Sequence, residues 1–469
     1  MRIYNTLSRQ KEPFKPLNEG QVLMYVCGPN LYGPCHVGHA MSYVVFDVVR
    51  RYLEYRGYSV RHVQNFTDLE DRIIETAQAQ HTSVQELAEV YVVRFLIEMR
   101  DLNIERAHEY PRATEVIPKI IEIIQGLVTK GYAYTVDGDV YYHVASNPDY
   151  GKLSRRTLEG MEAGARIEVD ERKEHPMDFA LWKNAKPGEP SWQSPWGLGR
   201  PGWHIECSAM AIEFLGQQID IHGGGQDVLF PHHENEIAQT ESYTGRIPFV
   251  KYWIHNGLLR PREGQEKMTR HLSNFVSLQE ALQRYNPDAI RLFLISSHYR
   301  SPLVWSDEGV LAVERGLGRL REALTLRGLG AKTKGQEETG TLTQFAERTR
   351  EAFIEAMDDD FNTPVAISHL FDLAREINRA KQEIHAAALA PAQGILRTLA
   401  NALGLTLQET RPRDAVDAAP FIELLASIRS DLRANKQWKL ADMIRSQLSK
   451  LGVTLEDGSE GTTWRLSKE

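Results

Sequence analysis

Four side chains of the types that bind zinc, Cys27, Cys207, His232 and Glu236, each lie beside a motif suited to handling a nucleotide. If a helix begins just before His232, then His232 and Glu236 lie one turn apart on the same face and can point at one ion, whereas His233 points elsewhere. Two sulfurs, a nitrogen and an oxygen form a softer donor set than a calcium or magnesium site. Spacing alone nevertheless favours a different interpretation, with two buried structural cysteines and a polar helix.

A second group of residues is suited to phosphate. The stretch His36-Val37-Gly38-His39 follows a predicted strand and turn and opens a predicted helix. A helix N-terminus offers free N–H groups and the positive end of the helix dipole. His36 and His39 can add donors to ATP phosphates as charge grows on departing pyrophosphate, and Gly38 lets a flat base or ribose approach the backbone. These four residues alone leave open a loop with two incidental surface histidines.

The composition limits the classes of protein that fit. The 469 residues are 42% hydrophobic and 25% charged, which is ordinary for a globular protein of two to four domains. With a net charge of −8 the chain is not a polycation, so a nucleic-acid partner would need a local basic surface. Three cysteines without a secretory leader indicate a reducing cytosol. No apolar stretch approaches the roughly 20 residues that cross a bilayer. We therefore expect a soluble, cytoplasmic protein with no membrane partner.

The predicted elements that carry these residues form an α/β domain. An apolar helix over 43–52, a strand over 59–63 and a helix from Asp71 give a β-turn-α-β order, which opens a doubly wound parallel sheet of the Rossmann type. A buried strand over 219–222 ends at three glycines, 223–225.

The middle of the chain is predicted to be an amphipathic helix over 112–130 and a hairpin over 132–144 that turns at Asp137-Gly138. Residues 183–202, rich in Pro, Gly and Trp, are predicted to form a loop that delivers Cys207.

Long helical patterns begin near residue 305. They are interrupted by a polar stretch at 330–341, predicted to be a mobile loop, and by a break at 409–417. Two helices and a small hairpin are predicted to end the chain.

Taken together, the motifs resemble those of the cysteinyl-tRNA synthetases, class I enzymes with a His-Ile-Gly-His signature. The resemblance spans essentially the full chain. It is carried by Cys35-His36-Val37-Gly38-His39-Ala40, by Gly202-Trp203-His204-Ile205-Glu206-Cys207, by Met357-Asp358-Asp359-Asp360-Phe361-Asn362-Thr363-Pro364, and by 25–29, 65–68, 220–225, 230–236 and 461–464.

This resemblance implies three parts: a class I catalytic domain over 1–304 with a connective insertion at about 110–200, a helical bundle over 305–410 on the tRNA side, and a small α+β anticodon-recognition subdomain over 415–469. A monomer is expected.

The resemblance also implies one Zn²⁺ per chain, held by the four residues named first. Zinc would bind the substrate cysteine as a thiolate and so discriminate it from serine, which pocket shape does poorly. Gly28, Thr67, Trp203 and Asp227 would surround the rest of the amino acid, with Asp227 facing the ammonium group. From the residues alone, Trp203 could equally be a core residue and Thr67 a helix N-cap.

The second class I signature, Lys-Met-Ser-Lys-Ser, is altered here to Lys267-Met268-Thr269-Arg270-His271. Lys267 and Arg270 are predicted to bind ATP, whose phosphates Mg²⁺ would accompany, and Arg270 to stabilise the pyrophosphate. Asn30 and Met41 also depart from the family pattern. The changes fit a divergent working enzyme, a paralogue with retuned adenylation, or a degraded activity.

The last part of the chain is locally basic, with six Lys or Arg and two Asp over 429–450. Arg433, Lys436 and Trp438 fit an RNA surface, because phosphates attract cations and an unstacked base can lie on an indole. Composition alone favours a solvated helix face with one buried Trp, but the family places anticodon recognition here.

The sequence therefore predicts a zinc-dependent ligase that joins L-cysteine, through an ATP-derived adenylate, to tRNA(Cys). Two alternatives remain: a paralogue that ligates cysteine to a small amine, and a non-catalytic regulator that binds tRNA or cysteine.

Overall fold

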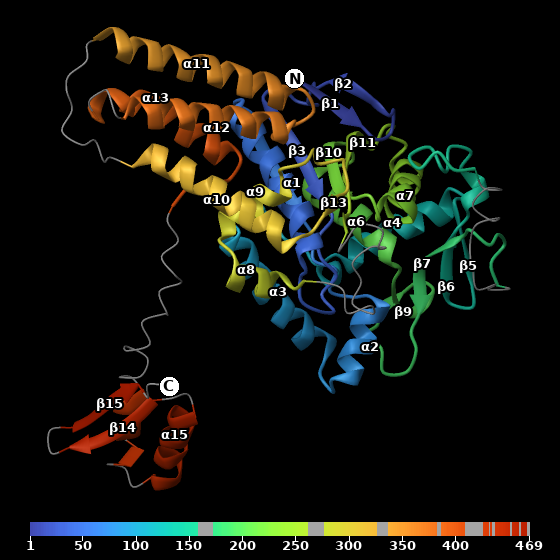
Figure 1. Cartoon of the computed structure of the whole chain (residues 1–469). Coiled ribbons are helices and arrows are strands. Elements are labelled where there is room, and N and C mark those ends of the chain that lie inside the picture. The colour runs from blue at the N-terminus through green and yellow to red at the C-terminus, as the bar shows by residue number, and fades with distance from the viewer. Residues whose placement is uncertain are drawn as a thin grey trace. The chain divides into compact units, whose positions relative to one another are not determined.

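Four parallel strands form the sheet on which the candidate site is built (Figure 1). They are β3 (Gln21–Val26), β4 (Ser59–Gln64), β10 (Ile219–Gly225) and β11 (Val250–Asn256), in the order β11-β10-β3-β4. The strand order reverses between β3 and β10, and ligands of open α/β sheets bind outside the carboxyl ends of the strands at such a reversal. The structure, a computed structural model, thus confirms the predicted doubly wound α/β domain.

The sheet is buried on both faces by helices. Along β3, Val22, Met24 and Val26 pack into the core that contains α1 (Val37–Tyr55), whereas Tyr25 packs into the opposite core with α4 (Ile117–Thr129) and α6 (Trp203–Leu215). This alternation follows from the two-residue period of a strand.

The structure describes residues 1–157, 172–260, 276–325, 336–381, 386–408, 425–430, 432–433, 437–450, 453–458 and 461–466. The chain divides into two compact units, Met1–Leu407 and Gln408–Glu469. Within the described ranges, no helix has the length and apolar character that a bilayer crossing requires. Three further helices of the first unit are α2 (Asp71–Ala79), α3 (Val84–Asp101) and α7 (Glu234–Thr244).

A second, antiparallel sheet lies in the predicted insertion. Its strands are β5 (Ala133–Val136), β6 (Asp139–Tyr142), β7 (Phe179–Asn184), β8 (Trp192–Ser194) and β9 (Gly197–Pro201), in the order β5-β6-β7-β9-β8. The predicted hairpin at Asp137-Gly138 is confirmed, with both residues at positive φ as a type I′ turn requires.

The prediction of a loop over 183–202 was wrong for half of this range, which belongs to β7, β8 and β9. Gly199, in β9, permits close packing within this sheet: a Cβ atom there would collide with the Trp182 indole and the Lys183 carbonyl.

Short elements lead from the sheet to a helical bundle: β12 (Leu259–Arg260), α8 (Leu278–Arg284), α9 (Pro287–Leu294) and β13 (Leu303–Val304). The bundle contains α10 (Asp307–Leu324), α11 (Gln336–Asp358), α12 (Thr363–Ala380) and α13 (Ala386–Ala402) (Figure 1). The loop predicted over 330–341 was wrong for 336–341, which form the first turns of α11, since a polar sequence does not prevent a helix. Residues 326–335 lie outside the described ranges.

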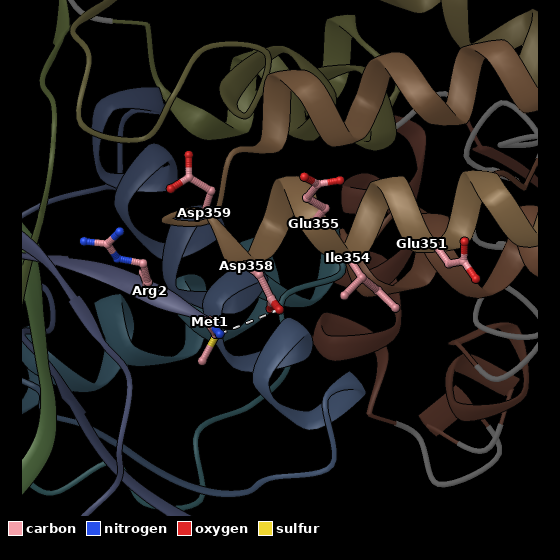
Figure 2. Close-up of a pocket in the computed structure, with 7 residues that line it drawn as sticks. All are labelled: Met1, Arg2, Glu351, Ile354, Glu355, Asp358 and Asp359. Atoms are coloured by element: carbon pink, nitrogen blue, oxygen red, sulfur yellow. Dashed lines mark ion pairs between the residues drawn. The ribbon is translucent and has the colours of Figure 1, made fainter.

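The carboxyl end of α11 packs beside the first strands of the chain, β1 (Arg2–Asn5) and β2 (Gln10–Pro13). Asp358 pairs with the amino group of Met1 at 3.7 Å and Asp359 with Lys11 at 2.7 Å. Figure 2 shows this junction, with Asp358 directed at Met1. A surface depression of about 510 Å³ is lined there by Met1, Arg2, Glu351, Ile354, Glu355, Asp358 and Asp359.

The second unit contains a short helix over 425–430, α15 (Trp438–Lys450) and an antiparallel hairpin of β14 (Val453–Gly458) and β15 (Gly461–Leu466). Its core is small, formed by Ala426, Leu448, Val453 and Leu455. The predicted two helices and hairpin are confirmed, whereas the predicted break at 409–417 lies outside the described residues.

Candidate active site

A cleft of about 920 Å³ opens at the carboxyl ends of β3 and β10, at the reversal of strand order. The structure brings together there all but one of the predicted site residues of the first unit that it describes: Cys27, Gly28, His36, Gly38, His39, Thr67, Trp203, Cys207, Asp227 and His232. The exception, Glu236, is fully buried in contact with this group. Lys267 and Arg270 lie outside the described residues.

The four predicted metal ligands converge at one end of this cleft. One donor atom each from Cys27, Cys207, His232 and Glu236 lies within 4.8 Å of the other three. The Nε2 atom of His232 is 3.1 Å from Oε1 of Glu236, and the Sγ atom of Cys27 is 3.8 Å from the same oxygen. Residues separated by about 200 positions are thus gathered by the end of β3, by α6, and by α7 with the turn before it.

Two histidines beside this group were not predicted to face it: His222 was not considered, and His233 was predicted to point elsewhere. Cys27, His222, His233 and Glu236 form a second possible ligand set that shares Cys27 and Glu236 with the first. The prediction that His233 points elsewhere was wrong, because its Nε2 atom lies 3.2 Å from the Cys27 sulfur. Residues Leu229–His233 form a turn before α7 that is kinked at Phe230, whose φ is −138° and ψ is 131°. His233 precedes Glu236 by three residues, a spacing that shares a helix face just as the four-residue spacing of His232 does. His222, the last residue before the three glycines of β10, offered a signal that the sequence interpretation did not use.

Further histidines orient those that face the group. Nδ1 of His204 lies 2.9 Å from Nδ1 of His232, and Nδ1 of His233 lies 2.8 Å from Nε2 of His255. In each pair one nitrogen donates and the other accepts, so the Nε2 atoms of His232 and His233 remain directed at Cys27 and Glu236. Such partners are what metal-binding histidines use to fix ring orientation and tautomer.

The electrostatics of the group favour a cation. Burial raises the pKa of Glu236 well above its ordinary value and lowers the pKa of His222 and His233, which holds both rings neutral. A hydrogen bond from Cys27 lowers the pKa of Cys207 to about 7. Oε2 of Glu236 is buried without a hydrogen-bond partner among the described residues. A divalent ion would satisfy this carboxylate, and the sulfur, nitrogen and oxygen donors fit zinc.

The phosphate-binding motif lies at the start of α1. His36 is the N-cap residue, and its Nδ1 atom accepts a hydrogen bond from the His39 N–H at 3.2 Å. The two imidazole rings stack with centroids 3.7 Å apart. A Cβ atom at Gly38 would lie 2.9 Å from the His36 ring, so this glycine makes room for that ring as well as for a ligand. Two imidazoles and a helix N-terminus therefore face the cleft together.

The residues predicted to contact the substrate amino acid line the cleft between the metal-ligand group and the start of α1. A Cβ atom at Gly28 would collide with the Asn65 carbonyl, so only glycine fits where β3 and β4 end. Thr67 is buried and its hydroxyl accepts a hydrogen bond from Asn65, while Glu70 occupies the N-cap position of α2, which excludes the N-cap interpretation of Thr67. Trp203 lies 4.5 Å from the His232 ring, centroid to centroid, and lines the cleft rather than the core.

In the second unit, the interpretation of Trp438 as buried was wrong: its side chain is 55% exposed, with the Arg433 guanidinium 6.0 Å from the ring. Lys436 lies outside the described residues.

Comparison with known proteins agrees with this geometry. Residues 13–315 match the family of "tRNA synthetases class I (C) catalytic domain", and residues 352–408 match the DALR domain. The chain is 54% identical over 468 residues to the cysteine–tRNA ligase of Dehalococcoides mccartyi (strain BAV1), with 100% of each chain covered. It is 47% identical to that of Desulfitobacterium hafniense, with 99% of each covered. The fold matches the Mycobacterium tuberculosis methionyl-tRNA synthetase in complex with methionyl-adenylate, with a TM-score of 0.58 at 16% identity over 87% of this chain and 94% of that one.

The sheet and the family match define an enzyme with a class I aminoacyl-tRNA synthetase catalytic domain. Within that class, the full-length relatives show that the chain belongs to the cysteine–tRNA ligase family.

Proposed function

We propose that the chain is a zinc-dependent cysteine–tRNA ligase that works through cysteinyl-adenylate. The observation that carries the proposal is the shared cleft, with the thiol-rich donor group at one end and the His36–His39 helix N-terminus at the other. A cysteine that fits between them would have its thiol near the donor group and its carboxylate near the phosphates.

The reaction takes two steps, transfer of an adenylyl group to cysteine and then transfer of the cysteinyl group to tRNA. A cysteine carboxylate oxygen attacks the α-phosphorus of ATP, and the bond to pyrophosphate breaks. A terminal ribose hydroxyl of tRNA(Cys) then attacks the acyl carbon, loses its proton and releases AMP. His36 and His39 would donate to the charge that grows on pyrophosphate, and Asp227 would hold the ammonium group. Bound zinc would supply a Lewis acid that selects a thiolate over a serine hydroxyl.

Cysteine attachment to total tRNA by zinc-replete protein tests the proposal. Charging restricted to the cysteine isoacceptor is the expected result. Pyrophosphate exchange without charging would instead favour a small amine acceptor, and the absence of both activities from zinc-bound, folded protein would favour a regulatory homologue.

His204 is predicted to position the zinc ligand His232. Replacing His204 with leucine removes the nitrogen 2.9 Å from Nδ1 of His232, and we expect zinc affinity to fall about 10- to 100-fold. Zinc competition with a chelator measures the change. His204→Asn, whose amide can occupy part of the place of Nδ1, should retain more affinity than His204→Leu, and equal losses in both variants would contradict a positioning role.

Trp438 is predicted to stack on an anticodon base. Trp438→Ala should raise the KM for tRNA about tenfold, because base stacking on an aromatic ring contributes about 1–3 kcal/mol, while tRNA-independent pyrophosphate exchange stays unchanged. Met443→Ala is the matched control, since Met443 is a similarly exposed apolar residue of α15. An equal rise in KM in both variants would point to a general loss of α15 packing.

A further inference from the structure

Asp360 is a fully buried carboxylate in the turn between α11 and α12, outside the cleft just described. Its Oδ1 atom accepts hydrogen bonds from the Tyr4 N–H and from the Tyr299 hydroxyl, each at 2.8 Å. Its Oδ2 atom pairs with Arg300, with Nη2 at 2.8 Å and Nε at 2.9 Å. One side chain of the bundle therefore binds β1 and the segment that follows α9.

The backbone of Asp360 is equally constrained. Asp360 and Phe361 have φ values of +64° and +51°, and the Asp360 N–H donates to the Arg2 carbonyl at 2.9 Å. Non-glycine residues adopt this left-handed conformation at a cost of about 1 kcal/mol or more, which the surrounding contacts must offset. The contacts of the Asp360 carboxylate do so while directing it at Tyr299 and Arg300.

The segment that Asp360 holds supports one rim of the cleft. The Gly257 N–H donates to the Tyr299 carbonyl at 2.7 Å, and the Leu303 N–H donates to the Leu258 carbonyl at 3.2 Å. A Cβ atom at Gly257 would collide with the Ser301 carbonyl, so the two backbones are in close contact. β12 and β13 continue the pairing through Leu259 and Leu303.

That rim lies on the phosphate side of the cleft. Gly257, Leu258 and Leu259 line the cleft with His36 and Gly38. A Cβ atom at Gly38 would be 3.8 Å from Cβ of Leu259, which places β12 against the first turn of α1. The hydrogen bonds of the Asp360 carboxylate reach this rim through Tyr299 and Arg300.

We propose that Asp360 is a positioning residue for ATP, which fixes the Gly257–Leu259 rim through Tyr299 and Arg300 and thereby links the α11–α12 turn of the bundle to the phosphate side of the cleft. The choice of ATP as the ligand rests on the proposed function. Without the carboxylate, the Tyr4 N–H, the Tyr299 hydroxyl and the Arg300 guanidinium lose their shared acceptor and the rim loses its support. Misplacement of about 1 Å can cost catalysis about a hundredfold.

Asp360→Asn tests this proposal, with Asp359→Asn as the matched control one residue away, where the side chain is 55% exposed. Asp360→Asn should weaken equilibrium ATP binding and raise the KM for ATP in pyrophosphate exchange about tenfold. The KM for cysteine and the zinc content should stay unchanged, and Asp359→Asn should change none of these quantities. Unchanged ATP affinity in Asp360→Asn, or equal losses for ATP, cysteine and zinc, would overturn the proposal.

Tyr299→Phe keeps the proposal testable if Asp360→Asn does not fold, because it removes one hydroxyl and preserves the ring. We expect ATP affinity to fall about threefold, with cysteine and zinc unaffected, and unchanged ATP affinity would overturn the proposal. Direct ATP binding also separates this inference from the proposed function. Wild-type protein that binds ATP without catalysing exchange would contradict the ligase, while the comparison of variants would still decide the role of Asp360.

Discussion

Cys207→Ser is expected to lose zinc and to lower cysteine-dependent ATP–pyrophosphate exchange by more than about a hundredfold. Loss of a hydrogen-bond partner of a metal ligand typically costs 10–100-fold in affinity, and loss of the ligand itself should cost more. The Cys207 side chain is 1% exposed, with a pKa of about 7, so a thiolate is accessible at neutral pH, whereas a serine hydroxyl is not readily deprotonated. Zinc content by mass spectrometry of the native protein and exchange at saturating ATP measure the two effects.

The third cysteine supplies the control for this prediction. Cys35 is also buried, but it belongs to neither candidate ligand set. Cys35→Ser should therefore keep its zinc, and loss of zinc from both serine variants would show a general response of the fold rather than loss of a ligand.

Comparison of histidine variants decides between the two overlapping ligand sets. Cys207 and His232 belong to one set, and His222 and His233 belong to the other. If the set predicted from the sequence holds the ion, His232→Ala should lose zinc more completely than His222→Ala. Zinc retained in Cys207→Ser and His232→Ala but lost in His222→Ala would assign the ion to the set that contains His222 and His233, and would contradict the prediction.

The sequence predicted those parts of the site that depend on residue type and on the order of strands. The cleft lies where β3 and β10 end because hydrophobic strands and a connecting helix specify the doubly wound sheet, and Cys27 follows β3 directly. The local propensities around His36 likewise specify a helix start, which the structure confirms with a capping box.

The sequence could not predict the features that depend on side-chain direction or on distant pairing. His233 and His232 lie three and four residues before Glu236, and both spacings share a helix face, so spacing alone does not decide which ring faces the metal-ligand group. Residues 183–202 were predicted to be a loop because the range is rich in Pro, Gly and Trp, whereas Gly199 lies within β9 in close contact with Trp182. Asp360 acquires its partners only through tertiary contacts with Tyr4 and Tyr299, which no local pattern contains.

His36→Asn is expected to lower pyrophosphate exchange about 10²- to 10³-fold while leaving the free energy of unfolding nearly unchanged. Nδ1 of His36 caps α1 by accepting the His39 N–H, and asparagine is among the best N-cap residues, so the helix start is preserved. The imidazole that would donate to the departing pyrophosphate is removed, and loss of one such donor typically costs this much in rate. Exchange kinetics and chemical denaturation of the same preparation measure the two quantities.

His36→Ala separates the helix cap from the catalytic contribution. It should lose exchange to the same extent as His36→Asn and also about 1 kcal/mol of stability, because alanine offers the His39 N–H no side-chain acceptor. If His36→Asn instead kept full exchange while His36→Ala lost it, the role of His36 would be to begin α1, and binding of the phosphates would fall to His39 and the helix N-terminus. Full exchange in both variants would mean that His36 takes no part in stabilising the pyrophosphate, as expected for an incidental surface histidine.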